Sequence, residues 1–455
     1  MPRPAARPCC SVLRYDVWWT NTRPGCRRSA GENPVRQQLL SPHEVGGYEQ
    51  LCRDMVVALT ARGHACAVIT STHGVTAATP AQPEVHRVLR IQPDYGSRLH
   101  PALQFMFTRA ALEKHNLDQF HQVCAAFHPE VVFVWNVCGL PRSLCLAAEA
   151  LPDAVVAYWL AGYSPADPDE YWQYWQTEPG QRPAQVVLRR CLGRWALRKM
   201  RREGKPLRPK MAHVAVVSDG MRRQGLAAGS LPAHTRVLYN GVETDLFWAQ
   251  RSGLAQPLRL LFAGRMSEDK GPQVAIEALG HLVNDAGITA VSLTLVGNGP
   301  QRQMSRLKEL VEELRLQPYV TFLGWQPRDR MPAIMREHDV LLFCTSGVEA
   351  FARVVLEAMA SGQVVIGTLT GGTGEVLVEG VTGLTYPAGD STELSRQILR
   401  LVHDPALWES LSRTGQRVAC ERYGMDRMVD EIEAFLQEAL DAGHDSHPNS
   451  MPARG

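Results

Sequence analysis

Two cations stand close together in a short loop bounded by glycines. Arg265 and Lys270 lie between Gly264 and Gly271, after an apolar run typical of a strand and before a helical pattern. In α/β proteins, such strand-to-helix loops lie at the edge of the sheet where ligands bind. A guanidinium can hold a phosphate through two parallel hydrogen bonds, and an ammonium acts as a point charge. The pair therefore suits a diphosphate, although solvated loop charges would give the same pattern.

Two carboxylates follow at a spacing of eight residues. Glu349 falls on a predicted loop and Glu357 within the predicted helix 354–360. The helix begins between them, and its first N–H groups have no partner in the helix, so they can bind a phosphate. Glu357 could then accept two vicinal hydroxyls of one sugar, and Glu349 those of another. The alternative is a solvated helix face, which the small, apolar residues at 358–362 make less attractive.

Glycines and acidic residues supply two weaker signals. The segment 371–375 is rich in glycine and follows a predicted strand, so a ligand could approach its backbone closely. Asp167 and Asp169 form an Asp-x-Asp triplet that could bind Mn²⁺ or Mg²⁺. The triplet stands in a loop-like segment without further clustered ligands, and we expect no metal site.

The elements that must position these residues form two series of short apolar strands alternating with helices. This pattern predicts parallel α/β sheets, and hence two Rossmann-like doubly wound domains facing each other across a cleft. The first series has strands at 67–70, 85–91, 131–134, 154–158 and 213–218. The second has strands at 258–263, 293–296, 320–323, 340–343 and 364–367, and helices at 274–283, 306–314 and 354–360.

The domain organisation follows from these series. We predict an irregular N-terminal extension at 1–40, a first domain at 41–247 and a second domain at 248–425. A C-terminal helix at 426–440 and a disordered tail at 441–455 complete the chain. Domain closure about a linker near residue 250 is expected when a ligand binds.

Bulk properties exclude several classes of protein. The chain has 455 residues, a formal net charge of +2 and 11 cysteines without a Cys-x-x-Cys pair. A balanced charge argues against nucleic acid as the main partner, and scattered cysteines indicate free thiols in a reducing compartment. No run reaches the roughly 18 apolar residues of a membrane-spanning helix, and the N-terminus lacks an apolar signal core. These features predict a cytoplasmic protein.

Taken together, the motifs resemble the family 4 retaining glycosyltransferases of GT-B fold, the glycosyl transferases group 1. The resemblance runs from about residue 41 to residue 423 and is strongest at 258–390. Its most specific part is Phe351-x-x-Val354-x-Leu-Glu357-Ala-Met-Ala, with Glu349 eight residues before Glu357. The segments 46–49, 61–64, 237–247, 380–383 and 387–390 also match the family.

The resemblance implies a hexosyltransferase type of enzyme that uses a nucleotide diphosphate sugar and no metal or other cofactor. It also implies that the domain at 248–425 binds the nucleotide sugar and that the domain at 41–247 lies on the acceptor side. Arg265 and Lys270 would stabilise the leaving diphosphate, Glu349 would hold the donor sugar and Glu357 the ribose. The donor-binding residues implied in this way are Gly46, Gly47, Arg265, Lys270, Glu349, Phe351, Ala352, Arg353, Val354 and Glu357. Of these, Arg265, Lys270 and Glu349 are also implied to act in catalysis.

Four features depart from the family pattern. The segment 35–40 is a poor candidate for the buried strand before Gly46, and residues 159–164 lack the His or Asp common there. Ala352 replaces a usual glycine, so its methyl group could tighten or distort the phosphate loop. Arg353 replaces an apolar residue and either contacts phosphate or points to solvent. Two alternatives to transfer therefore stay open: a non-catalytic nucleotide-sugar-binding protein and a sugar-nucleotide epimerase of the same fold.

A cationic segment at 188–210 interleaves arginine and lysine with leucine and tryptophan. This pattern is typical of a basic amphipathic helix on anionic lipid. It is equally typical of a solvated helix. The acceptor, whether a lipid, a glycan or a small molecule, is not identified by the sequence, and a peripheral contact with the inner face of the membrane is one alternative.

Overall fold

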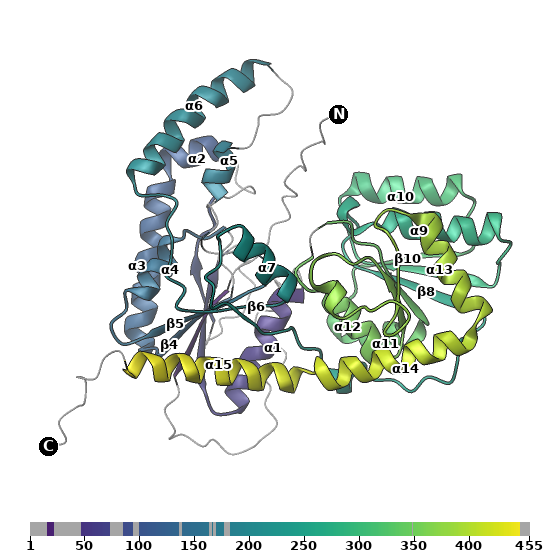
Figure 1. Ribbon diagram of the computed structural model, residues 1–455. Coiled ribbons are helices and arrows are strands. Elements are labelled where there is room, and N and C mark those ends of the chain that lie inside the picture. Colours follow the sequence, from purple (N-terminus) through teal and green to yellow (C-terminus); the bar gives the residue numbers. More distant parts are fainter. Residues whose placement is uncertain are drawn as a thin grey trace. The chain divides into compact units, whose positions relative to one another are not determined.

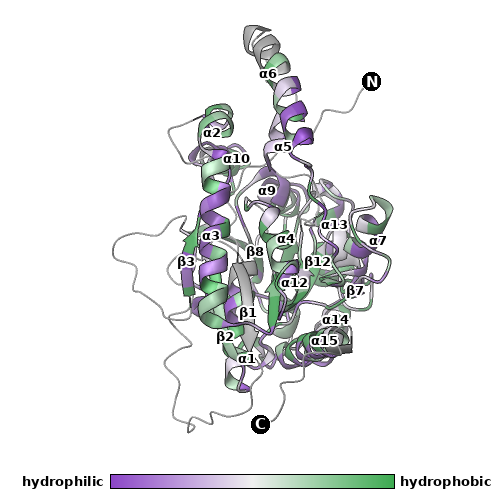
Figure 2. Cartoon of the chain, turned by 90° about the vertical axis from the view of Figure 1, so that its left-hand side faces the viewer, coloured by the Kyte–Doolittle hydropathy of each residue, from purple (hydrophilic) through white to green (hydrophobic). Residues whose placement is uncertain are grey.

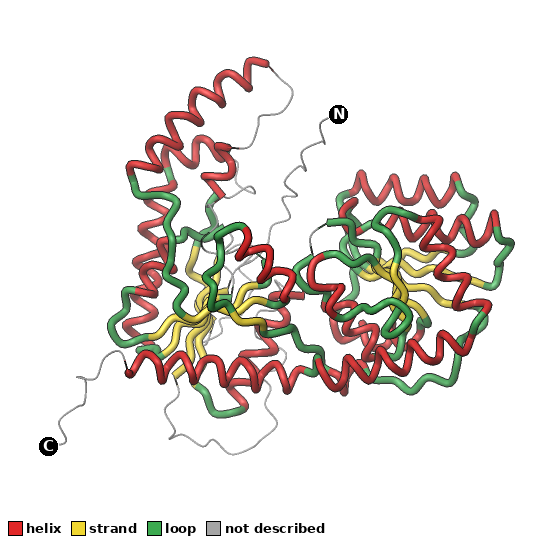
Figure 3. The backbone as a smooth tube through the Cα atoms, in the orientation of Figure 1, coloured by secondary structure: helices red, strands yellow, loops and turns green. Residues whose placement is uncertain are grey.

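The chain divides into two compact units, each built on a central sheet (Figures 1 and 3). The structure is a computed structural model that describes residues 16–21, 47–72, 85–93, 100–135, 139–162, 166, 170–176, 183–347 and 349–445. Unit 1 comprises Met1–Ala215, Gly225–Arg236 and Ile432–Gly455, and unit 2 comprises Val216–Gln224 and Val237–Glu431. The chain therefore changes unit after Ala215, Gln224, Arg236 and Glu431, and the change at Arg236 lies about ten residues before the boundary predicted from the sequence.

The sheet of unit 1 has seven strands in the order β3-β2-β1-β4-β5-β6-β7. The described pairs β2–β3 and β4–β5 are parallel, as the alternating pattern predicts. The strands are β1 (Asp16–Asn21), β2 (Ala65–Ser71), β3 (Val85–Leu89), β4 (Val131–Val134), β5 (Val155–Leu160), β6 (His213–Val216) and β7 (Arg236–Val237).

Strand β1 corrects two expectations. It lies within residues 1–40, which we predicted to be irregular, and it stands between β2 and β4 in the interior of the sheet. It also pairs antiparallel with β2 and with β4, so the sheet of unit 1 is mixed. Its sequence, Asp-Val-Trp-Trp-Thr-Asn, contains β-branched and aromatic residues that favour strands, but Pro- and Arg-rich flanks obscure them. The candidate strand 35–40 lies outside the described residues.

Helices of unit 1 bury their apolar positions at the predicted spacing. In α1, Leu51, Met55, Val56 and Leu59 are all buried. The helices are α1 (Gly47–Ala61), α2 (Pro101–Phe107), α3 (Arg109–Phe127), α4 (Ser143–Glu149), α5 (Glu170–Gln176) and α6 (Pro183–Arg202), while α7 (Asp219–Ala227) crosses from unit 2 into unit 1.

The sheet of unit 2 has six strands in the order β10-β9-β8-β11-β12-β13, and its described pairs are all parallel. This order is that of a doubly wound Rossmann-type sheet, as predicted. The strands are β8 (Leu258–Ala263), β9 (Val291–Val296), β10 (Val320–Gly324), β11 (Val340–Phe343), β12 (Val364–Gly367) and β13 (Leu384–Thr385). Strands β8, β11 and β12 have the predicted bounds, because each is a continuous apolar run.

Helices cover the sheet of unit 2 and share its apolar core, in which Leu260, Leu293, Leu342 and Ile366 are buried. The helices are α8 (Thr244–Phe247), α9 (Pro272–Gly280), α10 (Gln301–Glu313), α11 (Met331–Glu337), α12 (Arg353–Ala360), α13 (Ser391–His403) and α14 (Pro405–Arg422). Helix α9 continues into a π-helical segment, His281–Asp285, where a regular helix was predicted. Short 3₁₀ segments occupy Glu268–Lys270, Arg328–Arg330 and Gly371–Glu375.

Helix α15 (Met425–Asp445) begins in unit 2 and ends in unit 1. It continues through residues 441–445, so the prediction of a disordered tail from Asp441 is wrong for these residues. Positions 446–455 lie outside the described part. Among the helices that the structure describes, none is long and apolar enough to cross a membrane.

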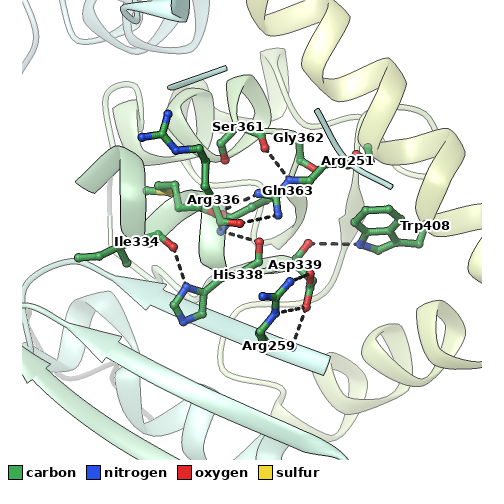
Figure 4. A network of polar contacts seen from close by, with 12 residues as sticks. Arg251, Arg259, Ile334, Arg336, His338, Asp339, Ser361, Gly362, Gln363 and Trp408 are labelled. Atoms are coloured by element: carbon green, nitrogen blue, oxygen red, sulfur yellow. Dashed lines mark hydrogen bonds and ion pairs between the residues drawn. The ribbon is translucent and has the colours of Figure 1, made fainter. Parts of the chain in front are cut away.

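A network of polar contacts fixes helix ends in unit 2 (Figure 4). Arg251 donates to the carbonyl oxygens of Met335, Arg336 and Ser361 at 2.9, 3.0 and 2.8 Å, which lie at the C-terminal ends of α11 and α12. Asp339, which is 1% exposed, pairs with Arg259, with 2.7 Å between Oδ1 and Nη2. A charged donor that satisfies three helix-end carbonyls orders the carboxyl ends of two helices at once.

Candidate active site

The predicted site residues of unit 2 follow strands β8 and β11, which are neighbours in the sheet. The chain proceeds from β8 outward to β9 and β10 on one side, and returns to β11 on the other. Strands β8 and β11 therefore flank the point where the strand order reverses, the usual ligand position of a doubly wound sheet. Arg265 and Lys270 lie on the loop after β8, and Glu349 lies on the loop after β11.

These two loops are joined by backbone contacts. The N–H of Ser346 donates to the carbonyl of Asp269 at 2.9 Å. Gly271 has φ +71°, and a Cβ on it would lie 2.3 Å from the carbonyl oxygen of Cys344. A side chain at this position would therefore separate the two loops, which is why a glycine follows Lys270.

The glycine-rich segment after β12 holds the loop of Glu349 from its other side. A Cβ on Gly371 would lie 1.6 Å from the carbonyl oxygen of Glu349, and one on Gly372 would lie 2.5 Å from that of Ala350. The N–H of Gly372 donates to the carbonyl of Glu349 at 3.2 Å. The glycines thus position the loop of Glu349 through its backbone. From the sequence we had expected only that they let a ligand approach closely.

Lys270 and Glu349 form an ion pair through Nζ and Oε2, and both side chains are largely shielded from solvent. Arg265 is more exposed, and its Nη2 lies 3.6 Å from Oδ2 of Asp269. The structure therefore brings together two of the three residues predicted to be catalytic, in direct contact. A diphosphate bound by Lys270 would compete with Glu349 for the ammonium group.

Helix α12 begins at Arg353, and its N-cap residue, Ala352, has no side-chain group that could cap the first N–H groups. Ala352 precedes it in an extended conformation, with φ −80° and ψ 100°, which alanine adopts without strain. The methyl group therefore does not distort the backbone here, contrary to one of the expectations from the sequence. Val354, predicted to offer its N–H to phosphate, lies in the first turn of the helix.

Phe351 is 5% exposed, and its ring packs against Tyr239 and Tyr423, with centroids 5.5 and 5.8 Å away. The side chain thus anchors the loop between Glu349 and α12 in an aromatic cluster. Its predicted contribution to donor binding would therefore act through the position of this loop.

Glu357 takes part in an ion cluster that the sequence did not suggest. Its Oε1 accepts from Nη1 of Arg328 at 2.9 Å and lies 4.0 Å from Nε of Arg353. The other carboxylate of the cluster, Glu243, pairs with Arg328 and lies 3.6 Å from Nη2 of Arg353. Arg353 is 8% exposed. Of the two alternatives for this residue, the one in which it points to solvent is therefore wrong.

Electrostatics support this arrangement of charges. Burial alone would raise the pKa of Glu243, but the guanidinium groups of Arg328 and Arg353 outweigh it and hold that pKa below its ordinary value. Arg328 and Glu243 come from loops 85 positions apart in the sequence. No local pattern in the sequence marks either residue as the partner of the other.

Glu375, at the end of the glycine-rich segment, caps helix α7. Its two oxygens accept from the N–H groups of Asp219 and Gly220 at 2.9 and 2.8 Å, and Oε2 also accepts from the hydroxyl of Tyr239 at 2.9 Å. Burial and the carboxylate of Glu375 raise the pKa of Tyr239, so this tyrosine remains a hydrogen-bond donor. The cap explains why residues 216–224 belong to unit 2.

The predicted residues of unit 1 are only partly described. Gly46, Asp167 and Asp169 lie outside the described residues, and Gly47 is the first residue of α1. Trp159 is fully buried at the carboxyl end of β5 and packs on Trp135, with ring centroids 4.3 Å apart. In the described part of the chain, no group of three His, Cys, Asp or Glu side chains could hold a metal ion.

Comparisons with known proteins identify the family. A family model for "Glycosyl transferases group 1" matches residues 247–418, and one for "Glycosyltransferase Family 4" matches residues 45–246. The chain belongs to the group 1 glycosyltransferases of family 4. This membership confirms the resemblance inferred from the motifs around Glu349 and Glu357.

Individual relatives show the extent of the likeness. The chain is 29% identical to the N-acetyl-alpha-D-glucosaminyl L-malate synthase of Bacillus anthracis over 181 residues, 40% of this chain and 45% of that protein. The match spans about half the length of such curated relatives.

Solved structures show the fold. The sucrose-phosphate synthase of Thermosynechococcus elongatus is similar with a TM-score of 0.62 at 18% identity, over 87% of this chain and 94% of that one. The HepE protein of Anabaena, solved in complex with UDP, is similar with a TM-score of 0.52 at 20% identity, over 72% and 89%. This family 4 chain therefore has the predicted GT-B fold.

Proposed function

We propose that this chain is a retaining glycosyltransferase that moves a hexose from a nucleoside diphosphate sugar to an acceptor without a metal ion. The observation that carries the proposal is the convergence in unit 2 of Lys270, Glu349 and the N-terminus of α12 at one edge of the sheet. Family membership and the UDP complex of the similar HepE protein support a nucleotide donor.

The charge of each residue determines its proposed role. Arg265 and Lys270 would neutralise the charge that grows on the leaving diphosphate, and the N–H groups at the start of α12 would bind its distal phosphate. Glu349 would accept hydroxyls of the donor sugar, and Glu357 those of the ribose. Two fixed cations in this position would stabilise the negative charge that a divalent metal ion stabilises in other enzymes. We therefore expect activity in the presence of EDTA.

The test is a panel of UDP, GDP and ADP sugars incubated with the full chain, with Mg²⁺ or with EDTA. We expect one donor to be hydrolysed slowly or transferred to an added acceptor in both conditions, with the α-configured sugar released first as the α-anomer by NMR. Release of the β-anomer, or activity only with Mg²⁺, would contradict the retaining, metal-independent mechanism.

The same panel separates the two alternatives. A non-catalytic binding protein would be stabilised by a nucleotide sugar without consuming it. An epimerase would convert the donor into its isomer while the nucleotide diphosphate bond stays intact. Either result would replace transfer as the function of the site.

A peripheral membrane contact is a second proposal for this chain. The sequence indicated the segment 188–210 for it, whereas the proposal now also uses apolar residues of α2. In the part of α6 whose side chains the structure describes, Ala196 and Met200 are buried against aromatic residues of α5 and against Phe105 of α2, so they are not available to a membrane. Helix α2 is coloured mostly as apolar in Figure 2. Its residues Leu103, Met106 and Phe107 are 42%, 41% and 72% exposed, and Trp195 of α6 is 48% exposed. The exposed cations of α6 nearby are Arg194, Arg198, Arg201 and Arg202.

Apolar side chains beside cations favour a surface rich in anionic lipid. We therefore expect the chain to float with vesicles that contain phosphatidylglycerol and not with neutral ones. Replacing Met106 and Phe107 by serine should abolish flotation, as should replacing the four arginines by glutamine. Unchanged flotation of both variants would contradict the proposal.

A further inference from the structure

Three backbone segments of unit 2 pack closely against one another beside the proposed donor site. Gly371 and Gly372 contact the loop of Glu349, and the same two glycines contact the start of α7. A Cβ on Gly372 would lie 2.6 Å from Cβ of Ser218. One on Gly220 would lie 3.2 Å from the carbonyl oxygen of Gly371. Because segments packed this closely have no free space between them, a displacement of one is transmitted to the next.

The carboxylate of Glu375 holds two of these segments together. Its Oε1 accepts from the N–H of Gly220 at 2.8 Å. Its Oε2 accepts from the N–H of Asp219 and from the hydroxyl of Tyr239, each at 2.9 Å. A carboxylate that accepts hydrogen bonds through both oxygens cannot rotate freely. Since Glu375 is the last residue of the glycine-rich segment, it fixes this segment to the start of α7.

Two tyrosines connect Glu375 with the loop of Glu349 a second time. The hydroxyl of Tyr239 donates to the side chain of Glu375, and that of Tyr423 donates to its carbonyl oxygen at 3.3 Å. The rings of both tyrosines pack against Phe351, and their own centroids are 5.6 Å apart. Phe351 follows Glu349 by two positions in the same loop. Hydrogen bonds to Glu375 therefore orient the aromatic side chains that anchor this loop.

We infer that Glu375 is a positioning residue, which holds Glu349 in the place where it meets Lys270 and the donor sugar. The inference rests on the proposed function, in which Glu349 accepts hydroxyls of that sugar. The glycines and Phe351 hold the loop of Glu349, and Glu375 in turn holds both. A displacement of about 1 Å at a reacting group can reduce a rate by about 10²-fold. A residue that fixes such a loop can thus support turnover without touching the substrate.

The test compares Glu375→Gln and Tyr239→Phe with the wild type, as full chains with the donor that the panel of nucleotide sugars identifies. Glu375→Gln replaces one acceptor oxygen by an amide group, whereas Tyr239→Phe removes a hydroxyl and keeps the ring against Phe351. We expect kcat to fall by about 10- to 100-fold in Glu375→Gln and by about three- to tenfold in Tyr239→Phe.

Affinity for the nucleotide alone separates positioning from a general loss of binding. Arg265 and Lys270, which would bind the diphosphate, lie on the loop after β8. The dissociation constant of the free nucleoside diphosphate, measured by calorimetry, should therefore change by less than about threefold in both variants. Losses of nucleotide affinity as large as the losses of kcat would overturn the inference.

The double variant tests the connection between the two residues. Tyr239 donates to Oε2 of Glu375, so removal of either partner breaks the same contact. We expect the double variant to be no slower than Glu375→Gln alone, because effects through one shared contact are not additive. Additive losses of kcat would show that the two residues act separately, and the inference would be wrong.

Two variants away from the site are matched controls. Glu309→Gln lies on the exposed face of α10, and Tyr319→Phe stands directly before β10, at the amino end of that strand. Both should keep the wild-type kcat, and circular dichroism checks the fold of every variant. A folded Glu375→Gln variant that loses stability but keeps the wild-type kcat would reveal a merely structural role and overturn the inference. A wild type that consumes no donor would instead overturn the proposed function, and this inference with it.

Discussion

Lys270 and Glu349 meet across two loops of unit 2, and each compensates the charge of the other. The pair keeps the ammonium group near the start of α12, where a leaving phosphate would gain negative charge. An electrostatic contact that strengthens as charge develops lowers the barrier more than it tightens ground-state binding. Lys270 should therefore contribute to kcat more than to the affinity for the donor.

We expect Lys270→Met to lower kcat by about 10²- to 10³-fold, the range typical for loss of one group that stabilises transition-state charge. The KM for the donor should change much less. Initial rates at several donor concentrations separate the two constants. Lys308→Met, on the exposed face of α10, is the control and should leave both unchanged. A kcat of the Lys270 variant near the wild-type value would refute the role assigned to this residue.

Gly371 offers a test of how the loop of Glu349 is held. An alanine there would combine a φ of +57° with a Cβ 1.6 Å from the carbonyl oxygen of Glu349. Gly380 has a similar φ of +69°, but nothing lies within 4 Å of its Cβ position. Gly380→Ala therefore reports the conformational cost alone, about 1–2 kcal/mol.

We expect Gly371→Ala to lower the free energy of unfolding by more than Gly380→Ala, and to reduce transfer activity as well. Urea unfolding followed by circular dichroism, together with donor turnover, measures both effects. Equal losses of stability with full activity in the two variants would show that the loop is not held by this close approach.

At the level of residues, spacing along the chain located part of the candidate site. Arg265, Lys270, Glu349 and Glu357 could be placed at one sheet edge because each stands next to the end of a clearly apolar strand or at the start of the following helix. Arg328 and Glu243 could not be paired in advance. Their contact joins loops distant in sequence, and no local pattern specifies which opposite charge lies nearby.

Elements of unit 2 were predictable to the extent that burial dictated their pattern. Strands β8, β11 and β12 are buried runs of apolar residues, and their bounds agree with the sequence prediction. Strands β7 and β13 have two residues each and leave no periodic signal. Strand β1 was missed because its surroundings are rich in proline and arginine, and its antiparallel direction cannot be read from composition.

Helices α11 and α12 depend on Arg251 at their carboxyl ends (Figure 4). Arg251→Met keeps much of the aliphatic stem but removes three hydrogen bonds from a charged donor. We expect a loss of about 2–4 kcal/mol in the free energy of unfolding. Urea unfolding measures it, with Arg302→Met on the exposed side of α10 as the control. Equal stability of the two variants would contradict the capping role of Arg251.

Both units of the molecule contain carboxylates stabilised by cations. In unit 1, burial would raise the pKa of Glu113, but Lys205, together with Ser143 and Arg109, outweighs it and lowers that pKa below about 4.5. In unit 2, the pKa of Glu243 is likewise lowered below its ordinary value. A carboxylate with a depressed folded-state pKa contributes stability that is fully present above its unfolded pKa and is lost as the pH falls through the folded value.

We therefore expect the contribution of these two groups to be constant from pH 8 to about pH 5.5 and to be lost below about pH 4.5. The test compares urea unfolding of the wild type and of a Glu113→Gln, Lys205→Met double variant at several pH values. The variant should lose less stability between pH 5.5 and pH 3.5 than the wild type. The same acid dependence in both would show that the Glu113–Lys205 pair does not contribute.

The polypeptide enters unit 2 at Val216, leaves it at Gly225, enters again at Val237 and leaves at Ile432. Exchange of unit 2 between related genes by a single crossover near residue 248 would therefore separate partners. The start of α7 would lose its cap from Glu375, and His64 would face a foreign residue in place of Glu433, to which it bonds at 2.6 Å. Recombination that keeps such partners together needs several junctions, which favours joint inheritance of the two units.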